Sequence, residues 1–235
     1  MGREIYDLSQ TRIGFDVIGG FADVPGDLPF PVYTSLDEVE SLDFEVIVDF
    51  TSATALPTIA EFAKRVEKPL VTGSTGLTVD DERMLKVLAD TIPVFHAKNM
   101  SLGVTVMEIV TEKLAQLLPD FDIEIVEKHH RYKVDAPSGT AVALFEAVKR
   151  GREDVVPVEG RSGMGARESQ DVGIQAVRGG TIVGEHDVIF AGEDEVLELT
   201  HRAGSRRIFA YGALTAAAYI VKQKPGLYNM HDVLS

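Results

Sequence analysis

The sequence predicts an α/β protein with two domains: a Rossmann-like parallel-sheet domain, and an α+β domain with a mainly antiparallel sheet, for which a mixed sheet is the alternative. In the first ~95 residues, short β-branched runs alternate with helical stretches, which is typical of βαβ units. Further along, strand-like segments follow one another directly, separated by Gly-Gly or Gly-Glu-Asp. At 235 residues the chain is long enough to build two cores.

The strongest predicted strand of the first domain is Glu45–Phe50. It is apolar nearly throughout, as expected for a parallel strand covered on both faces. Hydrophobic spacing predicts the other elements of this half. We expect further strands at Asp16–Phe21, Pro69–Thr72 and Pro93–His96, and helices at Thr54–Arg65, Asp80–Ala89 and Leu102–Leu118.

The second half is expected to open with a strand at Asp122–His130, followed by a Pro-Ser-Gly turn and a helix at Thr140–Lys149. Three further strands are expected to pair as hairpins: Val172–Arg178, Thr181–Phe190 and Val196–Arg202. A final alanine-rich helix, Phe209–Val221, suits close packing and is expected to return to the first domain. The predicted domains are therefore 1–99 with 209–235, and 100–208.

Composition excludes several classes of function. The chain has no cysteine, so disulfides, Cys-ligated zinc and a Cys nucleophile are ruled out. Its net charge of −14 disfavours nucleic acid and anionic membranes as partners. No apolar run approaches the ~18 residues of a membrane span, and the N-terminus lacks the apolar region of a secretory signal. We therefore expect a cytoplasmic protein whose partner is a small molecule.

The segment Glu127–Ala141 concentrates groups that can do chemistry. A strand ending here sends His129 and His130 to opposite sides, with Lys133 just beyond. Ser138 is a good helix N-cap, and the N–H groups of a helix start bind carboxylates well. Gly139 lets a ligand approach the backbone. These features predict a pocket for a small dicarboxylate, with His or Lys as the proton donor.

Two other interpretations of this segment stay open from the residues alone. It could be a polar strand edge followed by an ordinary capped helix. It could also hold a metal through Glu127 and His129, although no clear third ligand lies nearby.

The segment resembles the active-site motif of dihydrodipicolinate (4-hydroxy-tetrahydrodipicolinate) reductases. That pattern is Glu, one residue, His-His, two residues, Lys, one residue, and then Asp-Ala-Pro-Ser-Gly-Thr-Ala, and every fixed position is met. The resemblance covers essentially the whole chain. Other matching segments are Val48–Thr51, Thr72–Gly76, Asn99–Gly103, Arg178–His186 and His201–Arg206.

The resemblance implies reduction of 4-hydroxy-tetrahydrodipicolinate to tetrahydrodipicolinate by NADH or NADPH, in lysine and diaminopimelate biosynthesis. It implies that His129 is the catalytic imidazole and that Lys133 gives the substrate a proton. The implied substrate-binding residues are His130, Ser138, Gly139 and Thr140. Members of this family are usually homotetramers, and we expect the subunits to meet on the sheet of the second domain.

The resemblance also implies cofactor-binding loops after two strands of the parallel sheet, where such sheets bind ligands. The loop residues are Gly73, Ser74 and Thr75, then Ala97, Lys98, Asn99 and Met100. The family usually has Gly-Thr-Thr in the first loop and an aromatic residue at the position of Met100, and Lys98 is also unusual. Taken alone, both loops could be plain turns.

An acidic residue after the second strand would bind the ribose hydroxyls of the cofactor. Asp23 is the candidate, although Ala22 could equally be the matching position and Asp23 could be a simple turn residue. No Arg or Lys follows to take a 2′-phosphate, which favours NADH while leaving NADPH possible.

The family begins with a strand and a glycine-rich phosphate-binding loop, and Met1-Gly2 resembles the end of that loop. We therefore expect an N-terminally shortened chain without its first strand, in which Gly2 is the remaining glycine of the phosphate-binding loop. A non-catalytic relative that keeps only the dicarboxylate pocket is the alternative. A semialdehyde dehydrogenase would need a cysteine, and a metal hydrolase built on the histidine pair would be sensitive to chelators.

Overall fold

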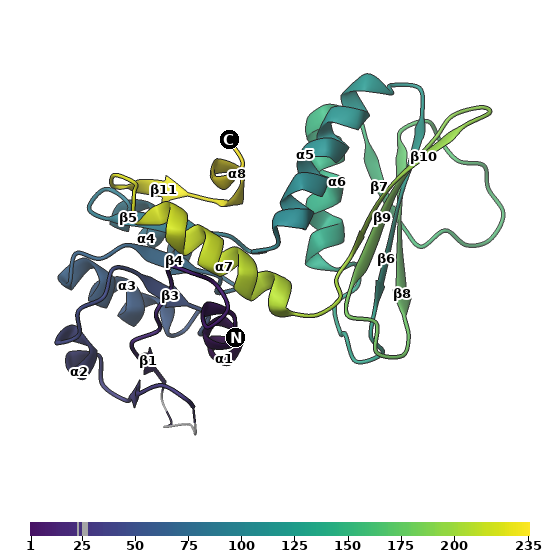
Figure 1. The fold of residues 1–235 in the computed structure, drawn as a ribbon. Coiled ribbons are helices and arrows are strands. Elements are labelled where there is room, and N and C mark those ends of the chain that lie inside the picture. Colours follow the sequence, from purple (N-terminus) through teal and green to yellow (C-terminus); the bar gives the residue numbers. More distant parts are fainter. Residues whose placement is uncertain (23, 25–27) are drawn as a thin grey trace. The chain divides into compact units, whose positions relative to one another are not determined.

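A computed structural model describes residues 1–22, 24 and 28–235 and shows two compact units (Figure 1). Unit 1 contains Met1–Ser101 and Arg207–Ser235, and unit 2 contains Leu102–Arg206. Both units combine helices with a sheet, so the predicted α/β class is confirmed.

Unit 1 is built on a four-stranded, fully parallel sheet with the strand order β11-β5-β4-β3. A separate two-stranded parallel sheet pairs β1 with β2. The strands are β1 (Gly20–Phe21), β2 (Val32–Tyr33), β3 (Ile47–Asp49), β4 (Leu70–Thr72), β5 (Pro93–His96) and β11 (Gly226–Tyr228). The helices are α1 (Gly2–Ser9), α2 (Leu36–Glu40), α3 (Leu56–Arg65), α4 (Val79–Leu88), α7 (Arg207–Ile220) and α8 (Met230–Val233).

Helices cover both faces of the parallel sheet, because alternate residues of each strand point to opposite sides. On one face α3 and α4 bury Leu56 and Leu85 against Leu70 and Val94 of the sheet. On the other face α1 and α7 form a second core. The small residues of α7 allow this close approach. At Gly212 an added Cβ would collide with the backbone carbonyl of Met100.

Unit 2 has a five-stranded sheet with the order β10-β9-β6-β8-β7, and Figure 1 shows α5 and α6 lying along one of its faces. The elements are α5 (Leu102–Leu117), β6 (Asp122–His129), α6 (Gly139–Gly151), β7 (Val156–Glu159), β8 (Asp171–Arg178), β9 (Glu185–Ala191) and β10 (Val196–Arg202). Along β6 the residues alternate between buried and partly exposed, so one face packs on the helices.

This second sheet is mixed rather than mainly antiparallel. β9 runs antiparallel to both β6 and β10, whereas β8 runs parallel to both β6 and β7. The parallel pairs arise because α6 carries the chain back across the sheet after β6, as in other crossover connections. The strand β7 was not predicted from the sequence.

The hairpin expected between Val172–Arg178 and Thr181–Phe190 is wrong. β8 and β9 do not pair with each other, because both pair with β6, one on each side. The glycine-containing connection Gly179–Gly184 therefore spans β6 instead of making a tight turn. The hairpin between β9 and β10 is confirmed.

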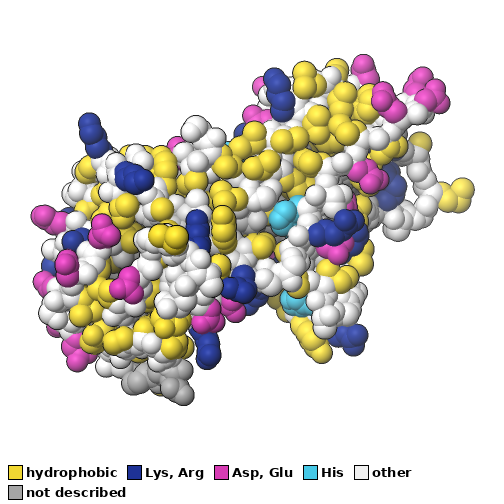
Figure 2. Space-filling view, in the orientation of Figure 1, with side chains coloured by type: hydrophobic (Ala, Val, Ile, Leu, Met, Phe, Trp, Pro, Cys, Tyr) yellow, Lys and Arg dark blue, Asp and Glu magenta, His cyan; other side chains and the backbone are white. Residues whose placement is uncertain are grey.

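Acidic side chains are scattered over the visible face of both units in Figure 2, which agrees with the net charge of −14. In the part of the chain that the structure describes, every helix is too short or too polar to cross a membrane.

Candidate functional site

The inner face of β6 changes from apolar to polar along its length. Ile123 and Ile125 belong to the core beneath α5 and α6. The next two inward residues are Glu127 and His129, which are 0% and 9% exposed. Buried polar groups need partners, so this end of the strand must carry a hydrogen-bond network.

Glu127 is the centre of that network. Its Oε2 lies 2.6 Å from Nδ1 of His129, and its Oε1 accepts from the backbone N–H of Ser138 at 3.0 Å. Arg178 on β8 donates to both carboxylate oxygens, each at 2.7 Å. Burial raises the pKa of Glu127, but the hydrogen bonds from Arg178 and His129 outweigh burial, and the pKa lies below its usual value.

The short contact between His129 Nδ1 and Glu127 places the proton of the neutral imidazole on Nδ1. Nε2 is then the edge available to a ligand. Gly184 stands next to this edge, and a Cβ added there would lie 3.1 Å from Nε2. The ring of His186 meets His129 edge-on, with 5.1 Å between centroids.

Ser138 caps α6 as predicted, because its hydroxyl accepts from the backbone N–H of Ala141 at 3.2 Å. The same hydroxyl lies 3.0 Å from Nε2 of His186. Burial, together with the neighbouring His129, lowers the pKa of His186 to about 4, so this imidazole is neutral at physiological pH.

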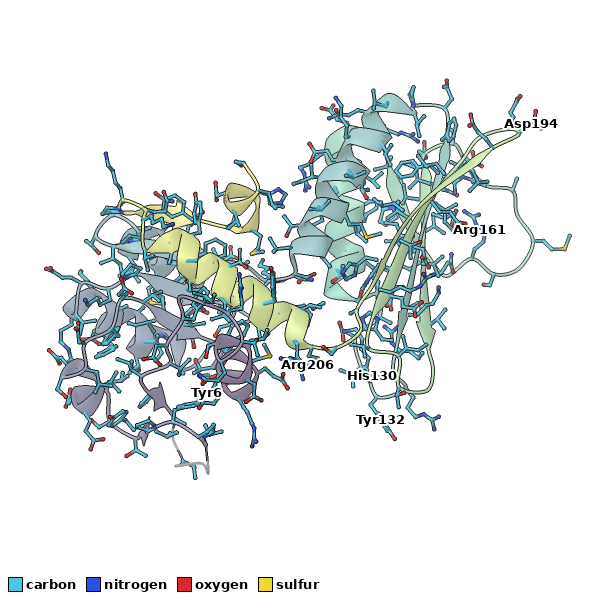
Figure 3. All side chains as sticks on the ribbon, viewed as in Figure 1. Tyr6, His130, Tyr132, Arg161, Asp194 and Arg206 are labelled. Atoms are coloured by element: carbon cyan, nitrogen blue, oxygen red, sulfur yellow. The ribbon has the colours of Figure 1, made fainter. Side chains whose placement is uncertain are left out.

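The loop after β6 holds the other predicted residues. His130 and Tyr132 lie together there, with ring centroids 6.3 Å apart (Figure 3). Lys133 Nζ donates to both carboxylate oxygens of Asp135, at 2.7 and 2.9 Å. This pairing lowers the pKa of Asp135. The Lys133 side chain is only 20% exposed, so its ammonium group is held close to the protein.

Gly139 and Thr140 form the first turn of α6, directly after the Ser138 cap. Nothing lies within 4 Å of the position that a Cβ of Gly139 would occupy. The space beside Gly139 can therefore admit an anion, and the helix dipole favours negative charge there. All six predicted catalytic and substrate-binding residues thus belong to one end of unit 2.

In unit 1 the predicted loop Gly73–Thr75 follows β4, and a buried carboxylate ties it to the loop after β3. Asp49 accepts hydrogen bonds from the backbone N–H and hydroxyl of Thr51 and from the hydroxyls of Thr72 and Ser74. The Ser74 side chain is therefore occupied inside the protein. Gly73 is half-buried and its N–H donates to the backbone carbonyl of Asp49 at 2.9 Å, whereas Thr75 is exposed.

The second predicted loop, Ala97–Met100, follows β5. Lys98 forms an ion pair with Glu82 of α4 at 3.0 Å, which accounts for the unusual lysine at this position. The side chain of Asn99 accepts from the backbone N–H of Ser101 at 2.9 Å. Met100 is 2% exposed and fills the core, so its side chain packs inside the domain.

The remaining cofactor candidates are Gly2 and Asp23. Gly2 is exposed at the first position of α1, while Asp23 lies outside the described residues. Within the described part of the chain, no set of three or more His, Cys, Asp or Glu side chains is arranged to hold a metal ion.

Sequence reasoning assigned no role to two residues that complete the site in unit 2, Arg178 and His186. Both lie more than forty residues from β6 along the chain and are brought beside it by strand pairing. The only available signal was the family-like segment Arg178–His186, which begins and ends with these two residues. It did not indicate that they contact residues of the Glu127–Ala141 segment.

Family models for the N-terminus and the C-terminus of dihydrodipicolinate reductase match residues 1–100 and 103–234. The chain belongs to the dihydrodipicolinate reductase family. The predicted resemblance is thereby confirmed over nearly the full length.

Known members of the family are similar along the chain. A 4-hydroxy-tetrahydrodipicolinate reductase from Caldanaerobacter subterraneus subsp. tengcongensis is 42% identical over 240 residues, covering 100% of this chain and 94% of the relative. The reductase of the same name from Rhodopseudomonas palustris is 49% identical over 201 residues, covering 83% and 73%.

Solved structures agree on the fold. A dipicolinate-bound dihydrodipicolinate reductase from a Paenisporosarcina species superimposes with a TM-score of 0.81 at 21% identity, covering 97% of this chain and 92% of that one. The diaminopimelate dehydrogenase of C. glutamicum gives 0.59 at 13% identity, covering 100% and 92%. The reductase family thus shares its architecture with other dehydrogenases.

Proposed function

We propose that this chain converts 4-hydroxy-tetrahydrodipicolinate to tetrahydrodipicolinate with NADH or NADPH, in lysine and diaminopimelate biosynthesis. The substrate gains a hydride and a proton, and its 4-hydroxyl group leaves as water. The observation that carries the proposal is the arrangement at the end of β6. There the paired His129 and Glu127, the ammonium group of Lys133 and the open start of α6 lie in one unit of a family member.

The substrate carries two carboxylates, and this end of unit 2 offers several groups to bind them. The first turn of α6, at Gly139 and Thr140, suits one carboxylate through backbone N–H groups and the helix dipole. We assign His130 and Lys133 in the preceding loop to the rest of the substrate. Ser138 shapes the helix start through its cap, which His186 supports.

Residues at the same end of unit 2 also provide for proton transfer to the substrate. A cation beside the reduced bond stabilises negative charge as it develops, and can release a proton to the atom that carries it. Lys133 Nζ is the assigned donor, and Asp135 keeps it in place until substrate competes for it. His129 presents Nε2 to the substrate, because Nδ1 is engaged by Glu127.

The cofactor fits unit 1. Bound NADH or NADPH would supply the hydride. The carboxyl ends of β4 and β5 carry Gly73–Thr75 and Ala97–Met100, where parallel sheets bind nucleotides. Among the described residues no side chain caps α1, and space is open around Gly2, so its first-turn N–H groups suit a phosphate. Asp23 is assigned to the ribose.

The first prediction tests the catalytic assignment. His129→Ala and Lys133→Ala are expected to lower kcat by ~10²-fold or more, the usual scale for a positioned proton-transfer group. His130→Ala and Thr140→Ala should act mainly on KM. The measurement is steady-state oxidation of NADH and NADPH with freshly generated substrate. If Lys133→Ala kept the kcat of the parent, Lys133 would not be the proton donor. If the parent bound dipicolinate but did not oxidise NADH or NADPH, the non-catalytic alternative would be favoured.

We also propose that the chain forms homotetramers through the face of the unit 2 sheet opposite α5 and α6. That face carries Val177 and Val196, which are 44% and 60% exposed. They stand among charged pairs such as Lys128 with Asp187 at 2.8 Å. A mixture of this kind is typical of a subunit interface.

A cytoplasmic location is part of the same proposal, because the reaction draws on the NAD(P)H pool of the cell. Fractionation of cells that express the native chain tests it, and recovery of the protein outside the cytoplasmic fraction would contradict it.

A further inference from the structure

Glu127 joins three segments of unit 2 with a single carboxylate that is 0% exposed. Oε2 contacts His129 Nδ1 on its own strand, and Oε1 accepts from the N–H of Ser138 at the cap of α6. Arg178 on β8 closes the set by donating to both oxygens. With both oxygens engaged in this way, the carboxylate is fixed in position and orientation.

Arg178 extends this set toward Lys133. Its Nη2 also donates to the backbone carbonyl of Asp135 at 2.6 Å, and the Asp135 carboxylate holds Lys133 Nζ. A continuous series of hydrogen bonds therefore runs from His129 through Glu127 and Arg178 to the loop of Lys133. Both residues assigned to the reaction are therefore linked to the same guanidinium group, His129 through Glu127 and Lys133 through Asp135.

We propose that Glu127 and Arg178 are positioning residues of the reductase site, an inference that rests on the proposed function. Glu127 keeps the proton of His129 on Nδ1 and presents Nε2 to the substrate. Arg178 holds this carboxylate in place and fixes the loop that carries Lys133. Neither residue needs to touch the substrate, because each acts through the group that it holds.

A purely structural ion pair is the competing explanation, since breaking any buried pair destabilises a fold. The two explanations differ in what happens to the imidazole. In E127Q the amide oxygen can still accept from the N–H of Ser138 and from Arg178 Nη2. The amide nitrogen then faces Nδ1 of His129 and also Arg178 Nη1, whose hydrogen bond is lost. The imidazole must then accept at Nδ1 and carry its proton on Nε2. A structural role requires no such change.

The experiment combines kinetics with a spectroscopic measurement. For E127Q we expect kcat to fall by ~10²-fold, the scale of a lost proton-transfer geometry. Affinity for dipicolinate, the probe in calorimetry, should stay near that of the parent. In ¹⁵N-histidine NMR spectra the proton of His129 should move from Nδ1 to Nε2. The matched control is E112Q, which alters an exposed pair with Arg150 in the same unit and should keep the parent kcat.

A second variant covers the case in which E127Q does not fold. R178K keeps the positive charge but loses the planar fork, and we expect ~10-fold lower kcat. Parent kcat in either folded variant would overturn the inference. The NMR measurement does not depend on activity. An unchanged His129 tautomer in E127Q would overturn the positioning role, whether or not the parent is an active reductase. A parent without reductase activity would, by itself, refute only the proposed function.

Discussion

Gly184 lies against the imidazole of His129, and the space at this position is limited. The glycine is buried in the connection between β8 and β9, where an added Cβ would lie 3.1 Å from Nε2. Such a separation is tighter than ordinary van der Waals contact, so the ring would have to shift. Because Gly184 has no side chain, the Nε2 edge of His129 can occupy its observed position.

We predict that Gly184→Ala lowers kcat by ~10-fold or more, because displacements of about 1 Å can cost ~10²-fold in rate. Steady-state kinetics and thermal unfolding would be measured together. Gly179→Ala is the control, since nothing lies within 4 Å of its added Cβ in the same connection. Equal activities of the two variants would show that His129 is not restrained by Gly184.

His186 gives unit 2 a defined dependence on pH. Burial and the neighbouring His129 lower its pKa from 6.5 to about 4. Between these values the unfolded chain binds more protons than the folded one, so the free energy of unfolding falls as the pH drops. The stabilisation that depends on neutral His186 is fully present above pH 6.5 and is lost as the pH falls toward about 4. The resulting decrease in the free energy of unfolding is at most about 3 kcal/mol.

Urea denaturation at pH 7 and pH 5 tests this expectation. The parent should lose more stability between these pH values than His186→Gln, which has no titrating ring. His231→Gln, an exposed histidine in α8, is the control and should follow the parent. Identical pH dependence in all three proteins would exclude His186 as the source.

At the scale of elements, the packing of α7 on the parallel sheet affects a candidate cofactor loop. Gly212 of α7 contacts the backbone of Met100 so closely that no Cβ fits. Met100 ends the loop Ala97–Met100. Any displacement of the helix would therefore also displace this loop.

We predict that Gly212→Ala lowers the free energy of unfolding by about 1–3 kcal/mol, the usual range for overpacking. It should also weaken NADH binding through the loop, and urea denaturation and calorimetric titration measure the two effects. Gly204→Ala serves as the control because the space around it is open. Loss of stability with unchanged NADH affinity would separate the helix from the cofactor site.

At the scale of the whole molecule, the open face of the unit 2 sheet is the proposed contact between subunits. Multi-angle light scattering of the parent should give four times the chain mass of 25.6 kDa. Val196→Asp should shift the distribution toward smaller species, because a buried unpaired charge opposes association. A parent of 25.6 kDa at micromolar concentration would contradict the proposed assembly.

Much of the fold was predictable because local pattern and environment agree. The strand at Pro93–His96 was predicted with its observed bounds, since a short apolar run between helices has few alternatives. The predicted helices around residues 54–65 and 80–89 are also present. Strand pairing in unit 2 was harder, because a Gly-Gly pair can turn a hairpin or begin a longer crossing.

The sequence by itself determined the family, the α/β class and the segment that carries the chemistry, because a motif of fixed spacing brings its own residues together on one strand and the following helix start. Tertiary structure alone decided the partners of that segment. Arg178 and His186 reach Glu127 and Ser138 only because β8 and β9 pair with opposite edges of β6. Hydrogen bonds between distant strands depend on register, and register is set by the packing of the whole sheet.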